Sequence, residues 1–407
     1  MLVTAAGVGP LVGPAPARAD TVRSLQWHLD ALKIPQAHRL SKGRGVVVAV
    51  VDSGVQASHP DLKGQVLPGK GFGPEAAADG RTDPDRRAGH GTAMAGIIAA
   101  RGGGADHALG IAPEAKILPV SLGPTGLREA PAGIRWAVDA GADVVNVSLG
   151  TDRDDPEVVD AVGYALSKNV VVVAATGNID SAYLEIPMPA KIPGVIAVGA
   201  ATRSGALWDG TITGPEMAIS APGDRIAAPA PPDAFPDGYL LYDGTSISAA
   251  IVSGVVALVR SRYPELDAAN VVNRLIRTTR DRGPKGRDPE YGFGSVDALA
   301  ALSREVPTVE SNPLGAPAAP SAGLSPATAG ADDKRDGSLV PLVVLIALGL
   351  VLVLIVVAVV VLVSRRSRRA ASGPPAGGLP PGTYPPPNPY LPSGPPQGPP
   401  DDPRPHQ

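Results

Sequence analysis

The fold is decided by the stretch Val46-Val47-Val48-Ala49-Val50-Val51, which is followed at once by Asp52-Ser53-Gly54. A nearly continuous valine-rich run of this length is typical of a parallel strand buried on both faces. Asp-Ser-Gly predicts a turn at its carboxyl end, and in open parallel sheets functional groups gather at that edge. Asp52 is therefore a candidate functional residue, although an aspartate in such a place more often only shapes a turn.

Further apolar runs alternate with segments of helical spacing along the chain. The runs are Val144–Leu149, Val170–Ala175 and Val195–Ala200, and the helical segments are Ala132–Asp139, Pro156–Ser167 and Leu266–Arg277. Alternating strands and helices predict an α/β fold, with a doubly wound, mostly parallel sheet covered by helices on both faces. We assign this folded unit to residues 20–305.

Composition excludes several classes of function. The net charge of -3 and the aromatic content of 3% give no support for nucleic-acid binding. The absence of cysteine excludes thiol catalysis and cysteine-ligated zinc. The six histidines are dispersed without ligand spacing, so we expect no catalytic metal and no cofactor. A structural calcium stays open, although no acidic loop resembles a calcium cage.

The two ends of the chain suggest export and membrane anchoring. Residues 1–19 end in Ala17-Arg18-Ala19, which favours the remnant of a signal peptide over a plain disordered terminus. Residues 339–363 form an uncharged apolar run long enough to span a bilayer as a helix. The arginines in residues 365–369 predict that the following side is cytoplasmic. The folded unit is then extracytoplasmic.

Two low-complexity segments flank the predicted single membrane span. Residues 306–338 are rich in proline, alanine, glycine and serine, which predicts a semi-flexible linker. Residues 364–407 begin with arginines and become proline-rich, which predicts a disordered cytoplasmic tail.

Two further polar residues are expected at helix starts. His90 lies between two glycines before an apolar run, and Ser246 follows Asp243-Gly244-Thr245 before another. Each alone is more often a structural capping residue. At the amino end of a helix, however, free amides favour negative charge and suit a developing oxyanion.

Taken in order, these motifs resemble the subtilisin-like serine peptidases. The matching fragments are Asp52-Ser53-Gly54, His90-Gly91-Thr92, Gly177-Asn178 and Gly244-Thr245-Ser246. The order Asp, His, Ser is that of the subtilisin triad. One departure is Ala250, which stands where the family usually has a proline soon after the serine.

The resemblance implies roles for individual residues in peptide-bond hydrolysis. Ser246 is the nucleophile, His90 the general base and Asp52 the group that orients His90. Asn178 and the Ser246 backbone N–H form the oxyanion hole. Substrate is expected to bind along residues implied to form the walls of the first specificity pocket: Ser148, Leu149, Gly150, Thr176 and Gly177.

A narrower resemblance is to the mycosins, membrane-anchored subtilases associated with type VII secretion in actinobacteria. It rests on the leader Gln26-Trp27-His28-Leu29-Asp30-Ala31-Leu32 and on the apolar span after a proline-rich linker. It implies protein or peptide substrates and type VII membrane components as partners, with the protease domain outside the cell membrane. The alternative is a structural subunit that stabilises the secretion complex, with catalysis secondary.

Overall fold

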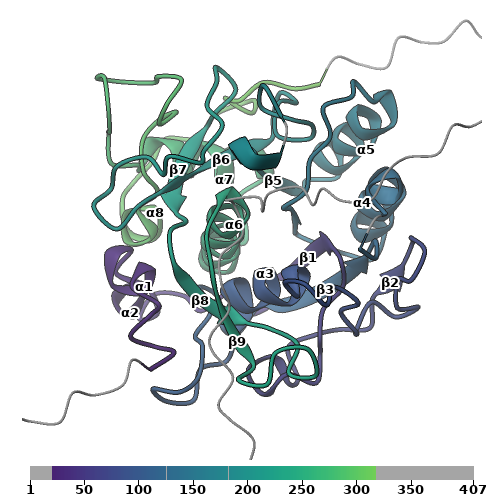
Figure 1. Cartoon of the computed structure of the whole chain (residues 1–407). Coiled ribbons are helices and arrows are strands. Elements are labelled where there is room, and N and C mark those ends of the chain that lie inside the picture. Colours follow the sequence, from purple (N-terminus) through teal and green to yellow (C-terminus); the bar gives the residue numbers. More distant parts are fainter. Residues whose placement is uncertain (1–20, 125, 182, 318–407) are drawn as a thin grey trace, which may run out of the picture. The chain divides into compact units, whose positions relative to one another are not determined.

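The computed structural model describes residues 21–124, 126–181 and 183–317 (Figure 1). The predicted signal segment, membrane span and cytoplasmic tail, and most of the predicted linker, lie outside these residues. The strands and helices expected from the valine-rich runs and the helical segments are present, and they form an α/β arrangement.

A seven-stranded sheet of parallel neighbours forms the centre of the described domain, in the order β2-β3-β1-β4-β5-β6-β7. A separate antiparallel hairpin pairs β8 with β9. The strand bounds are β1 Val47–Asp52, β2 Lys70–Gly71, β3 Lys116–Ser121, β4 Val144–Val147, β5 Val171–Ala175, β6 Ile196–Ala201, β7 Ile219–Pro222, β8 Ile226–Pro229 and β9 Tyr239–Tyr242.

Helices cover both faces of the sheet, as Figure 1 shows. One layer holds α1 His28–Ala31, α2 Ile34–Ala37, α3 His90–Ala99, α6 Thr245–Arg262, α7 Ala268–Arg277 and α8 Ala298–Ser303. The other layer holds α4 Ala130–Asp139 and α5 Pro156–Ser167. Short 3-10 turns occupy Pro60–Leu62, Leu127–Glu129 and Ile179–Ser181.

The two layers explain the valine-rich sequence of β1. Val48 and Val50 pack into the core under α3 and α6, whereas Ala49 and Val51 pack into the core under α4 and α5. Because side chains alternate across a strand, a strand between two helical layers needs apolar residues at every position.

Helix α6 is the longest helix of the described domain, and most of its residues are buried. Among the described residues it is the one helix whose length and composition would allow a membrane span, yet 83% of it is buried in the protein. It contacts five strands, β1, β4, β5, β6 and β7, as well as α3, so it is the core helix of this fold. The span predicted at residues 339–363 lies outside the described residues.

Some elements were not predicted from the sequence. Strand β3 contains Pro119, which normally argues against an inner strand, and β7, β8 and β9 are too short to stand out. The first part of the predicted linker packs against the domain: the Asn273 side chain donates to the Pro307 carbonyl oxygen at 2.8 Å, and the Gly194 N–H donates to the Leu314 carbonyl oxygen at 2.9 Å.

Candidate active site

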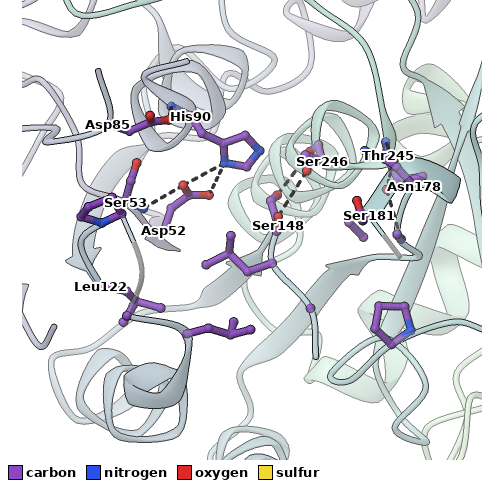
Figure 2. Close-up of a pocket in the computed structure, with 18 of the residues that line it drawn as sticks. Asp52, Ser53, Asp85, His90, Leu122, Ser148, Asn178, Ser181, Thr245 and Ser246 are labelled. Atoms are coloured by element: carbon purple, nitrogen blue, oxygen red, sulfur yellow. Dashed lines mark hydrogen bonds and ion pairs between the residues drawn. The ribbon is translucent and has the colours of Figure 1, made fainter. Parts of the chain in front are cut away.

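A cleft of about 420 Å³ lies beyond the carboxyl ends of the central strands (Figure 2). Asp52 reaches it from the end of β1, and His90 and Ser246 reach it from the first turns of α3 and α6. Asn178 follows β5. Residues far apart in the sequence are thus brought to one place by the common direction of the parallel strands, as the sequence predicted.

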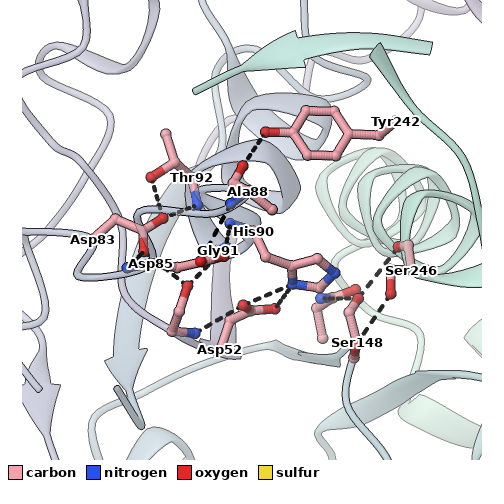
Figure 3. A network of polar contacts seen from close by, with 12 residues as sticks. Asp52, Asp83, Asp85, Ala88, His90, Gly91, Thr92, Ser148, Tyr242 and Ser246 are labelled. Carbon is pink, nitrogen blue, oxygen red and sulfur yellow. Dashed lines mark hydrogen bonds and ion pairs between the residues drawn. The ribbon is translucent and has the colours of Figure 1, made fainter. Parts of the chain in front are cut away.

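Asp52 and His90 form the central polar contact of the cleft (Figure 3). The His90 Nδ1 atom lies 2.8 Å from Asp52 Oδ1 and 2.9 Å from Oδ2. The Asp52 side chain is 1% exposed, and it also accepts from the Ser53 N–H at 2.8 Å. Since a carboxylate can only accept, this contact fixes the tautomer that carries the proton on Nδ1 and leaves Nε2 as the free nitrogen of a neutral ring.

The close approach of α3 to β1 requires glycine at position 91. A Cβ atom there would lie 2.2 Å from the Gly54 carbonyl oxygen and 3.1 Å from the Asp52 Cβ atom. Any larger residue would push the start of α3 away from the end of β1. The Gly91 next to His90 is therefore part of what holds the imidazole against Asp52.

Asp83 joins the segment after β1 to the start of α3, and it lies at the left in Figure 3. Its carboxylate accepts from the Ser53 hydroxyl at 2.8 Å, from the Thr92 hydroxyl at 2.6 Å and from the Thr92 N–H at 3.0 Å. Burial raises the pKa of Asp83 to about 6, although these hydrogen bonds oppose the shift. Asp83 therefore ties the residue after Asp52 to the second residue after His90.

Ser246 faces the ring of His90 from the amino end of α6, as Figure 3 shows. Among the described residues, the Ser246 hydroxyl makes one hydrogen bond, in which it donates to the Ser148 carbonyl oxygen at 3.2 Å. A bond from Ser246 to the His90 Nε2 atom, which the sequence interpretation assumed, would need rotation of the serine side chain. Rotation about one staggered torsion of a serine is a small change.

Asn178 is held by the residue before the serine. Its Oδ1 atom accepts from the Thr245 N–H at 3.1 Å and from the Thr245 hydroxyl at 2.9 Å. With Oδ1 occupied in this way, the amide NH₂ is the end of the side chain left to donate to a bound group.

Four of the five residues expected to form the first specificity pocket line the cleft. Ser148, Leu149 and Gly150 line one side of the cleft, and Gly177 lines the other. Thr176 differs, because its side chain is fully buried and its neighbour Ala175 lines the cleft instead. The reason is the alternation of side chains along an extended segment.

Several residues of the site were missed from the sequence. Asp83 and Tyr183 each act through contacts with segments distant in the chain, so no family motif marks them. Thr245 stands in the fragment Gly244-Thr245-Ser246, but its contact with Asn178 was not expected. The sequence signal that could have identified Asp83 is weak: it is an acidic residue in a predicted turn seven residues before His90. Within the described residues, no group of three or more metal-ligating side chains was found.

Comparison with known proteins gives one family. The model of the subtilase family matches residues 43–294. Mycosin-1 of Mycolicibacterium smegmatis is 32% identical over 336 residues, which cover 69% of this chain and 73% of mycosin-1. Subtilisin E of Bacillus subtilis is 34% identical over 291 residues, which cover 69% of this chain and 72% of subtilisin E.

Solved structures agree with the sequence comparisons. The crystal structure of MycP1 from the ESX-1 type VII secretion system matches with a TM-score of 0.62 and 30% identity. The match covers 76% of this chain and 92% of that one. The similarity thus extends over nearly the whole of the solved protease, and the residues matched by the subtilase family model, 43–294, include Asp52, His90, Asn178 and Ser246.

The Asp52–His90 contact predicts a particular dependence of activity on pH. Burial by itself lowers the pKa of His90, but the charge and hydrogen bond of Asp52, with Asp83 and Asp85, more than offset it and raise the pKa. A general base must be neutral, so kcat/KM should rise with pH and reach half its maximum above about 6.5, the ordinary imidazole value. The measurement is kcat/KM for a peptide substrate between pH 4 and 9.

Two variants test whether His90 is the group that titrates: one removes the carboxylate in contact with its imidazole, and the other removes a carboxylate far from it. Asp52→Asn should move the midpoint to lower pH, because burial then acts alone, and should lower kcat by roughly 10⁴-fold. Glu114→Gln should leave the midpoint in place, since Glu114 pairs with Arg44 away from the cleft. A midpoint unmoved in Asp52→Asn would contradict the assignment of the titrating group to His90.

The Asn178 contacts predict a second measurable effect. Asn178→Ala should lower kcat by about 10²–10³, the range for loss of one oxyanion donor, with little change in KM. Thr245→Val removes the hydroxyl that holds the amide and should lower kcat in the same direction by less. Equal kcat in wild type and Asn178→Ala would exclude the amide from the reaction.

Proposed function

The chain belongs to the subtilase family and is a serine endopeptidase, and on that premise we propose that Asp52, His90 and Ser246 are its catalytic triad in a membrane-anchored protease that serves a type VII secretion system. The observation that carries the triad is the buried Asp52–His90 contact, with the free edge of the imidazole facing Ser246. The family match and the likeness to mycosins support the rest.

The proposed reaction follows from these positions. Ser246 attacks the peptide carbonyl carbon while His90 Nε2 takes the hydroxyl proton, and Asp52 stabilises the imidazolium that forms. The tetrahedral oxyanion accepts from the Asn178 amide and from the Ser246 N–H at the start of α6. His90 then gives its proton to the leaving amine, and the acyl-enzyme reacts with water by the same steps.

Substrate is proposed to bind as an extended strand. Ser148, Leu149 and Gly150 continue from the end of β4 along the cleft, and their backbone groups would pair with the substrate. This pairing fixes register and brings one substrate carbonyl to Ser246. It gives affinity without demanding a particular side chain.

Membrane attachment is proposed from the sequence of residues 339–363. The apolar span, followed by four arginines, supports a single-pass anchor with the protease domain outside and the tail in the cytoplasm. The similar MycP1 structure comes from the ESX-1 type VII secretion system, and we extend that context to this chain. The proposed substrates are proteins or peptides that emerge from such a system.

Covalent labelling tests the nucleophile. A fluorophosphonate should modify the wild-type protein at Ser246, because an activated serine hydroxyl displaces the leaving group on phosphorus. Ser246→Ala should lose labelling and peptide cleavage and keep the melting temperature of the wild type. Ser248→Ala is the matched control, since Ser248 is buried two residues along the same helix. Labelling of Ser246→Ala at the wild-type level would overturn the assignment.

A second experiment separates catalysis from a structural contribution to the secretion complex. Ser246 lies in a cleft and offers little surface for docking, whereas deletion of residues 339–407 removes the whole predicted anchor. In a deletion strain, Ser246→Ala should restore export but leave substrates unprocessed, and the truncated protein should leave the membrane fraction and fail to restore export. Export blocked equally by Ser246→Ala and by the full deletion would refute a separate structural role.

A further inference from the structure

We infer that Tyr183 closes the far end of the first specificity pocket and restricts cleavage to bonds that follow a small residue such as alanine, glycine or serine. The inference rests on the proposed function, because the pocket is defined by attack of Ser246 on the substrate. It deepens that proposal by naming the side-chain class at the position before the cleaved bond.

The phenol ring of Tyr183 reaches from one wall of the pocket to the other. Its hydroxyl donates to the Gly150 carbonyl oxygen at 2.5 Å, on the wall that continues β4. On the other wall, a Cβ atom added to Gly177 would lie 3.2 Å from the Tyr183 Cδ2 atom, so the ring packs on the Gly177 backbone. The two contacts lie at opposite ends of one rigid side chain, which therefore fills the width between the walls.

Pro187 supports the ring from the same end of the cleft. A Cβ atom on Gly150 would lie 2.6 Å from the Pro187 Cγ atom, and one on Gly177 would lie 3.2 Å from Pro187 Cδ. Pro187 is buried, and the next residue, Met188, is fixed by paired backbone hydrogen bonds with Thr151 at 3.0 Å. The space behind Tyr183 is thus occupied by a segment that cannot easily withdraw.

A large substrate side chain would have to displace this ring. Burial raises the pKa of the Tyr183 hydroxyl, with a contribution from the charge of Asp152, so the group stays neutral and remains a donor to Gly150. Displacement would break that hydrogen bond and the packing against Gly177 and Pro187. Small side chains fit between the walls without this loss, and a pocket lined by glycine backbone is shaped for them.

The test uses the full chain in detergent and peptidyl phosphonates that differ only in the first residue, alanine or phenylalanine. The rate of covalent labelling of Ser246 is measured for each. Wild type should react at least about tenfold faster with the alanine compound, a typical effect of pocket size on selectivity. Tyr183→Ala should raise the ratio of the phenylalanine rate to the alanine rate by at least about tenfold.

Tyr183→Phe is the matched control, because it keeps the ring and loses only the hydroxyl. It should retain most of the wild-type preference, which assigns the effect to ring volume. Equal rates of wild type with both compounds, or an unchanged ratio in Tyr183→Ala, would overturn the inference. A simple fluorophosphonate without a peptide is tested in parallel: a wild type that fails to react with it would overturn the proposed function itself, whereas labelling with an unchanged ratio overturns only the role of Tyr183.

Discussion

The contact between the Asp52 carboxylate and the His90 imidazole is the interaction on which the rest of the site depends. A carboxylate that is 1% exposed is costly unless its oxygens are hydrogen-bonded. The Ser53 N–H and the His90 Nδ1 atom meet this need. The start of α3 must therefore lie directly on the end of β1, which only glycine at position 91 permits. The same contact fixes the imidazole tautomer and raises its pKa.

Ser246 is positioned by the packing of α6. The helix starts after Gly244, whose φ of 122° is a backbone conformation that glycine adopts readily and other residues rarely do. It then continues without a break through Ala250, which is fully buried. Alanine in place of the family's usual proline leaves this helix start regular. The Tyr242 hydroxyl, just before the helix, donates to the Ala88 carbonyl oxygen just before His90. The serine and histidine segments are thus tied together outside the cleft as well as across it.

The sequence predicts the inner strands, and it singles out Asp52, His90 and Ser246, because both depend on local signals. The valine-rich run before Asp52 indicates a strand that is buried on both faces. His90 and Ser246 each stand in a short sequence motif that resembles the subtilase family. Thr176 shows where such reasoning ends, since it identified the right segment but not which side chains face the cleft. The role of Tyr183 depends on contacts with Gly150 and Gly177 from other segments, and only the folded chain brings these together.

Without cysteine, the ends of the domain are held by burial and hydrogen bonds alone. At the amino end, the Trp27 indole N–H donates to the Asp224 carbonyl oxygen at 2.8 Å. The next residue, His28, is fully buried, and this burial, together with the positive charge of Arg23, lowers its pKa to about 3. The His28 ring therefore packs into the domain in its neutral form. At the other end, residues 306–317 are fixed to α7 and to the backbone before β6. Neither α7 nor β6 carries Asp52, His90 or Ser246. The contacts that fix residues 306–317 to the domain are therefore separate from those that hold Asp52, His90 and Ser246 at the cleft.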